Sequence, residues 1–298
     1  MNFFLYKNST YSLLINIIEK FSIYIVLIIL SKAFGANIHG KLILAINLSN
    51  IFFIFAELGV SNYVLRETAK GKALLNHILS SAFLIRIYFL PLILIVSFFY
   101  AIFIIDDQMS KIIFLIISLS NIFNFLSHPL VSYFRGIENF LVVFKIYFVD
   151  KFFLVSLIFL QAIFFNNILS IVSVFVLSSI LRLFISYIYF KNNASFSFLN
   201  LGIKKYFKNF YLLALIICLE TLAFRGEFFY LSFFNIDTLQ IGYYSYAYSI
   251  FLIPTLFSNS VVQILFPHFS KNGVYNFYKI LLLITVFTFI FSILIDIL

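Results

Sequence analysis

The stretch LSSAFLIRIYFLPLILIVSFFYAIFII, residues 79–105, decides the class of this protein. Arg86 is its one charged residue. A helix needs about 20 predominantly apolar residues to cross the roughly 30 Å hydrocarbon core of a bilayer. The stretch is long and apolar enough to meet that requirement, so it predicts a transmembrane helix.

Further segments of the same kind follow each other along the chain. They lie near 10–31, 42–64, 111–134, 143–165, 168–190, 206–234, 241–267 and 278–297. The longest polar connection, near 191–205, is too short to hold a soluble domain. We therefore predict an all-α, polytopic membrane protein with about nine transmembrane helices.

The composition excludes an ordinary soluble fold. Hydrophobic residues make up 63% of the chain and charged residues 10%, against about 45–50% and about 25% in soluble domains. The single cysteine, Cys218, excludes an internal disulfide and a cysteine metal cluster. The four histidines are scattered, so neither a metal site nor a cofactor is expected.

Basic residues gather in alternate connections, and this asymmetry predicts the orientation because cytoplasmic loops carry an excess of Lys and Arg. The basic connections contain Arg66, Lys70, Lys72, Arg135, Lys145, Lys191, Lys204, Lys205, Lys208, Lys271 and Lys279. The others contain Asp106, Asp107, Lys111 and Asp237, while Lys32 and Lys41 in the first hairpin oppose the pattern. We predict a cytoplasmic N-terminus. The net charge of +9 follows from this asymmetry, so no nucleic-acid partner is needed.

Two of the expected helices begin alike. GKLILA at 40–45 opens the second span and GYYSYA at 242–247 opens the eighth, with Gly and Ala at the same spacing. A parallel repeat predicts two similar lobes with a site between them, as in many transporters. Two small residues can also match by chance in so simple a sequence.

Several motifs resemble those of the polysaccharide-unit flippases, which are the O-antigen and capsule exporters of the multidrug/oligosaccharidyl-lipid/polysaccharide (MOP) superfamily. They are SKAFGANIHG at 31–40, AELGV at 56–60, VLRETA at 64–69, IGYYSYA at 241–247, Phe266-Pro267 followed by Ser270, and Arg225-Gly-Glu227, where the family often has Arg-x-Asp. These motifs occur in the family's order, and the resemblance covers essentially the whole chain.

The resemblance implies a fold and a function. It implies a six-helix N-terminal lobe at 1–190, a cytoplasmic connection at 191–205 and a partial C-terminal lobe of three helices at 206–298. Members usually have twelve or more helices, so the chain is expected to be C-terminally truncated. The implied activity is translocation of an isoprenoid-diphosphate-linked oligosaccharide across the cytoplasmic (inner) membrane by alternating access. The implied partners are that lipid-linked oligosaccharide, membrane lipids and other polysaccharide-assembly membrane proteins.

Ionisable residues inside the spans are candidates for function because they are costly to bury in a bilayer. Arg225 stands between Glu220 and Glu227 at spacings that do not favour pairing along one helix. We expect it to face a cavity between the lobes and bind the pyrophosphate, since one guanidinium group can donate two parallel hydrogen bonds to two phosphate oxygens. A structural pair with Glu220 or Glu227 is the alternative.

Lys20 and Arg86 are further candidates for the same anion-binding cavity. Glu57, Glu220 and Glu227 are candidates for binding a coupling ion. A structural interpretation is also open for several charges that lie near the expected cytoplasmic ends and could extend toward the head groups. These charges are Arg86, Asp150, Lys151 and Arg182.

Other functions remain as alternatives. They are a drug or cation antiporter of the same superfamily, a membrane glycosyltransferase or polymerase of the same pathway, and an inactive truncated remnant. The sequence lacks the Gly-x-x-x-x-Gly-Lys phosphate loop, the His-Glu-x-x-His metal motif and the Gly-x-Ser-x-Gly elbow. We therefore do not expect an enzyme.

Overall fold

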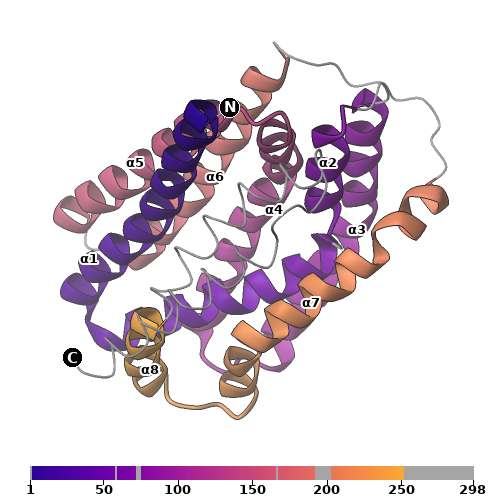
Figure 1. Cartoon of the computed structure of the whole chain (residues 1–298). Coiled ribbons are helices and arrows are strands. Elements are labelled where there is room, and N and C mark those ends of the chain that lie inside the picture. The colour runs from indigo at the N-terminus through magenta and orange to yellow at the C-terminus, as the bar shows by residue number, and fades with distance from the viewer. Residues whose placement is uncertain (1, 58, 72–74, 166, 192–202, 252–298) are drawn as a thin grey trace.

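The computed structural model describes residues 2–57, 59–71, 75–165, 167–191 and 203–251, and every regular element within these ranges is an α-helix (Figure 1). The helices are α1 (Asn2–Glu57), α2 (Val60–Ala69), α3 (Leu75–Phe103), α4 (Gln108–Gly136), α5 (Phe140–Phe164), α6 (Ile168–Lys191), α7 (Ile203–Phe233) and α8 (Thr238–Phe251). The all-α prediction is confirmed. The count of nine is not, because the predicted span 278–297 lies outside the described residues.

Helix α1 contains the first expected span and most of the second. Gly35 divides it, with a non-helical backbone at φ 82° and ψ 172°, and Figure 1 shows the change of direction. Glycine adopts a positive φ readily because it has no Cβ. A second glycine, Gly59 at φ 71°, separates α1 from α2. The expected span 42–64 is therefore divided between two helices.

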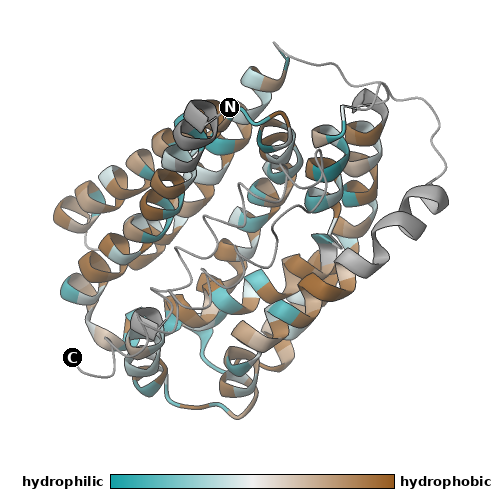
Figure 2. Ribbon diagram, viewed as in Figure 1, coloured by the Kyte–Doolittle hydropathy of each residue, from teal (hydrophilic) through white to brown (hydrophobic). Residues whose placement is uncertain are grey.

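The helices are suited to a lipid environment. Four described stretches are long and apolar enough to cross a membrane: Thr10–Phe55, Ile78–Phe103, Gln108–Gly136 and Ile168–Lys191. Figure 2 shows hydrophobic residues along most of the helices. Large apolar side chains also lie on the surface, among them Phe103 at 72% and Phe164 at 73% exposure. Such exposure is unfavourable in water and favourable in lipid, so the chain is a multi-pass membrane protein.

Buried apolar side chains form two main clusters toward opposite ends of the bundle. One lies at the α3–α4 end and includes Leu30, Leu42 and Ile113. The other lies at the α4–α5 end and includes Leu79 and Phe134. Helix α4 runs through both clusters and contacts α1, α2, α3, α5 and α6. Helices α7 and α8 pack mainly against α1, and the division into lobes at 1–190 and 206–298 stays a prediction.

Charged side chains lie between the two apolar clusters. On α3, Arg86 follows the last α4–α5-end residue, Ile85, and precedes Tyr100 of the other cluster. On α5, Asp150 lies between Tyr147 and Leu154 in the same way. We call this set the charged layer, and its members are Glu19, Lys20, Glu57, Arg86, His128, Asp150, Lys151 and Arg182.

The close approach of α4 to α2 gives a test of the packing. A Cβ added to Gly136 would lie 2.6 Å from Cβ of Thr68 and 2.8 Å from the carbonyl oxygen of Leu65. Overpacking of this kind costs about 1–3 kcal/mol, so Gly136→Ala should lower the melting temperature of the detergent-solubilised chain. Gly226→Ala on α7 is the matched control, because a Cβ there meets nothing within 4 Å. Equal melting temperatures for the two variants would contradict the α2–α4 contact.

Candidate functional site

Arg86 is the most deeply buried charge of the layer, with none of its side chain exposed. Its Nη2 donates to Ser61 Oγ at 2.7 Å and to Glu57 Oε1 at 3.2 Å. Its Nη1 donates to the carbonyl oxygen of Phe125, and the guanidinium lies over the Phe125 ring at 4.4 Å. One side chain of α3 therefore joins α1, α2 and α4.

Glu57 stands between two nitrogen groups. Its Oε1 accepts from Arg86, and its Oε2 lies 3.5 Å from Nδ1 of His128. His128 is surrounded by protein, yet 37% of its side chain is exposed. Because a carboxylate can only accept, Nδ1 carries the hydrogen that faces it. The other ring nitrogen of His128 is then the one with a free lone pair.

Asp150 is 1% exposed on α5 and has partners on two helices. Ser178 Oγ of α6 donates to its Oδ1 at 2.6 Å, and Lys151 Nζ lies 3.2 Å from its Oδ2. Arg182, one turn beyond Ser178, donates to the hydroxyl of Tyr147 at 2.7 Å and stacks over that ring at 4.4 Å. These contacts fix α5 against α6.

Glu19 and Lys20 bring α1 into the same layer. Arg182, Lys151, Lys20 and Arg135 all act electrostatically on Glu19. Lys20 in turn interacts electrostatically with Arg225 on α7. Both Glu19 and Lys20 are half-buried.

Arg225 contacts a side chain on another helix. Its Nη1 donates to Asn47 Oδ1 on α1 at 3.1 Å. Within the described part of the chain, no carboxylate lies at ion-pair distance from it. Glu220 is exposed on α7, and Glu227 is half-buried and acts electrostatically on Tyr244 of α8. The structure thus gives Arg225 a partner on another helix and not a pair with either glutamate.

The structure brings together some of the predicted site residues and separates others. Lys20 and Arg225 lie close enough to interact, whereas Arg86 belongs to the separate group around Glu57. The expectation that Arg86, Asp150 and Arg182 extend to the head groups is wrong. All three are buried, because hydrogen-bonding partners inside the bundle compensate their charges more fully than the distant membrane surface could.

Sequence reasoning missed several members of the site. His128 was counted only as one of four scattered histidines, and Asn47 and Tyr147 were not considered. The sequence contains a usable signal, since Asp150, Arg182 and Glu19 all interrupt long apolar runs. Charges placed in the middle of several spans predict mutual pairing, although they do not say which residues pair.

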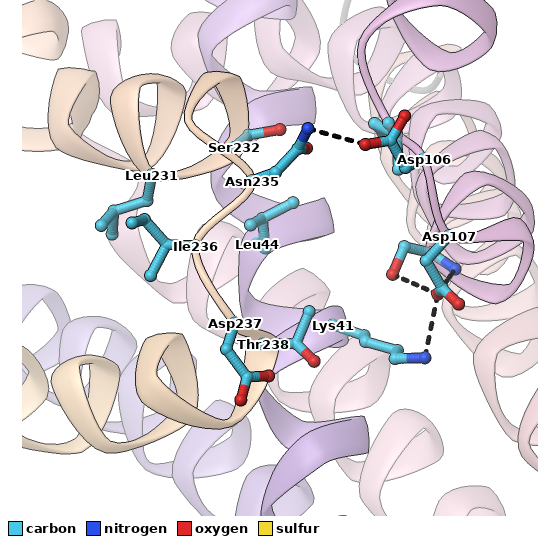
Figure 3. Close-up of a pocket in the computed structure, with 12 residues that line it drawn as sticks. Lys41, Leu44, Asp106, Asp107, Leu231, Ser232, Asn235, Ile236, Asp237 and Thr238 are labelled. Carbon is cyan, nitrogen blue, oxygen red and sulfur yellow. Dashed lines mark hydrogen bonds and ion pairs between the residues drawn. The ribbon is translucent and has the colours of Figure 1, made fainter.

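A separate polar pocket of about 350 Å³ opens at the α3–α4 end, between α1 and the α3–α4 and α7–α8 connections (Figure 3). Lys41 pairs with Asp107 at 2.9 Å, and Asn235 donates to Asp106 at 2.6 Å. Burial raises the pKa of the Asp107 carboxyl, but hydrogen bonds from Lys41 and Ser110 outweigh this effect and lower that pKa to about 2. The Asp107 carboxylate therefore stays charged at physiological pH.

The electrostatics of the layer favour an anion. Among the described residues of this region, the cations Lys20, Arg86, Lys151, Arg182 and Arg225 outnumber the carboxylates Glu19, Glu57 and Asp150. No described group of three or more His, Cys, Asp or Glu could hold a metal ion. The arrangement can attract and orient a negatively charged group.

Comparison with known proteins gives one result that bears on this site. A family model described as polysaccharide biosynthesis protein matches residues 5–272, which is most of the chain. Neither the curated proteins nor the solved structures contain a match.

The Arg86–Glu57 pair can be tested with a double-mutant cycle. Removing one partner of a buried ion pair costs about 3–5 kcal/mol, because the other charge is left uncompensated. Arg86→Met should therefore destabilise the chain more than the double variant Arg86→Met/Glu57→Met does. Unfolding in detergent can be followed by thiol labelling of Cys218, the one cysteine. Additive effects of the two substitutions would show that the groups do not interact.

Proposed function

Because the chain belongs to the polysaccharide biosynthesis protein family, the family of the polysaccharide and O-antigen flippases of the MOP superfamily, we propose that it translocates an isoprenoid-diphosphate-linked oligosaccharide across the membrane. The family is the starting point of the proposal. The choice of a diphosphate-bearing lipid as cargo rests on the residues of the charged layer.

The observation that carries the proposal is the pairing state of Arg225. Arg86 is paired with Glu57, and Arg182 is bonded to and stacked on Tyr147 with the carboxylate of Asp150 acting on it. Among the described residues, Arg225 has one hydrogen bond, to the neutral Asn47. A guanidinium has five N–H donors, and Lys20 adds a second positive charge nearby. The Glu19 carboxylate acts on both cations and offsets part of their mutual repulsion. A further anion beside them would stabilise both. A diphosphate has the charge and the paired oxygens for that position.

The cargo would move by alternating access between two lobes, 1–190 and 206–298. The diphosphate would be neutralised by Arg225 and Lys20 while the isoprenoid tail remains in lipid. In this proposal the chain lies in the cytoplasmic membrane with its N-terminus in the cytoplasm, and the α3–α4 end faces outward. Membrane lipids and other polysaccharide-assembly proteins would be its partners.

Glu57, Glu220 and Glu227 are the proposed ion-coupling residues, and their surroundings differ. Glu57 faces the titratable ring of His128. Glu227 reaches α8 through Tyr244. Glu220 is exposed. Glu57 is the best placed of the three, because a group that changes charge is already its neighbour.

The role of Arg225 can be tested in cells that lack the gene and carry a restored copy of the 298-residue chain. Arg225→Ala should reduce clearance of the lipid-linked intermediate from the cytoplasmic leaflet by about 10–100-fold, since a hydrogen bond to a charged group contributes roughly 1.5–3 kcal/mol. Arg225→Lys should retain part of the activity because it keeps the charge and loses the paired geometry. The measurement is the amount of intermediate in each leaflet.

Two results would oppose this function. Lys191→Ala, which removes an exposed cation at the end of α6, should leave clearance unchanged. An equal loss in that control would point to a general effect of net charge. If the gene's deletion causes no accumulation in a strain without a second exporter, the oligosaccharide is not the cargo.

A further inference from the structure

The two similar segments of the sequence meet each other in space. A Cβ on Gly40 would lie 1.8 Å from the carbonyl oxygen of Thr238, and a Cβ on Gly242 would lie 2.8 Å from the carbonyl oxygen of Ala36. Glycine at both positions lets the backbones of α1 and α8 touch. We call this contact the α1–α8 seam, and it consists of residues 36–40 of α1 and 238–246 of α8.

His39 lies inside the seam, with 1% of the residue exposed. Its Nε2 is 3.1 Å from Ser245 Oγ, and its ring stacks on Tyr246 with centroids 4.1 Å apart and planes 10° apart. Nearby, Thr238 Oγ1 donates to Asn37 Oδ1 at 2.5 Å. Separating α1 from α8 would expose the His39 ring, since the α8 residues Ser245 and Tyr246 lie against it.

The hydrogen bonds define the protonation state of the ring. Ser245 Oγ donates its hydrogen to the carbonyl oxygen of Gly242 at 2.7 Å, so it accepts from His39 and Nε2 carries a hydrogen. The other nitrogen, Nδ1, is buried and has no hydrogen-bond partner among the described residues. The carbonyl of Leu27 acts on the ring, but Nδ1 makes no hydrogen bond to it. One ring hydrogen, on Nε2, is enough for these contacts, so the neutral ring fits the closed seam.

We propose that His39 is a proton-binding site that controls the α1–α8 seam. A proton transferred from hydronium to the Nδ1 lone pair leaves water behind and converts the ring to an imidazolium. That cation would be held with almost no exposure and without a carboxylate partner, which is costly. Opening the seam exposes the ring to water, so proton binding and opening favour each other.

The neighbouring charged groups do not offer the same response. From α1, the α3–α4 connection and the α7–α8 connection, these groups are Lys32, Lys41, Asp106, Asp107 and Asp237, and Tyr246 faces the ring from α8. None of them contributes to the electrostatics of His39, which arise from burial and Leu27. Asp, Lys and Tyr ordinarily titrate below about 5 or above about 9, whereas histidine titrates between these values.

The test follows the distance between α1 and α8 in the full-length chain. In a Cys218→Ser background, spin labels are placed at Ala33→Cys and Tyr243→Cys, both of which are exposed positions. Distance distributions are recorded at pH 8 and pH 5.5 in liposomes. If the open ring titrates near its ordinary value of about 6.5 and the closed seam excludes the proton, the open-to-closed ratio should rise about tenfold at the lower pH.

Matched variants assign the response to His39. His39→Gln keeps a side-chain N–H for Ser245 and cannot be protonated, so its distance distribution should not change with pH. His128→Gln, in the charged layer, should keep the full response. A pH-independent distribution in the labelled chain with His39 intact would overturn the proposal. Retention of the response in His39→Gln would overturn it as well.

This proposal does not rest on the proposed cargo, because the experiment contains no lipid-linked oligosaccharide. If the seam responds to pH but the chain fails to clear the intermediate, His39 remains the proton-binding site and the export function is rejected. If the chain clears the intermediate but the seam does not respond to pH, only the proposed role of His39 is rejected.

Discussion

A charge inside a lipid bilayer is tolerated only when other groups compensate it, and this constraint organises the described bundle. Arg86 shows the principle most clearly. It has no exposed surface, and it is held by a carboxylate, a hydroxyl, a carbonyl oxygen and the face of an aromatic ring. These partners come from α1, α2 and α4. A single guanidinium therefore fixes the relative position of four helices that apolar packing alone would let slide.

The charged layer has a second consequence, which follows from its place between the two apolar clusters. Lipid tails are as apolar as leucine, so helix association in a membrane depends on close packing and on polar contacts. The clusters at the α3–α4 and α4–α5 ends supply the packing. Between the clusters, Asp150 and Arg182 make polar contacts that join α5 to α6. Arg225, with one neutral hydrogen-bond partner among the described residues, differs from Arg86 of the layer, which is paired with Glu57.

The sequence predicted the helices well and the contacts poorly, for a physical reason. An apolar run long enough to span a bilayer is a local property, and the runs at 79–105, 111–134 and 168–190 became α3, α4 and α6. Pairing is not local. Arg86 lies 29 residues from Glu57, and Arg225 lies 178 residues from Asn47. Without knowing which helices are neighbours, extension toward the head groups was a reasonable expectation for Arg86, and it was wrong.

The repeated glycine was a weak signal in the sequence and acquires a physical meaning in the structure. Gly40 and Gly242 are each followed by an alanine five residues later. Both lie in the α1–α8 seam, where a side chain on either would collide with backbone. Small residues at matched positions allow two helices to touch, and a contact made of backbone surfaces can separate without exposing a large apolar area. The charged layer is built from specific pairs that resist separation. A chain with both kinds of contact can keep one group of helices rigid while another pair moves apart.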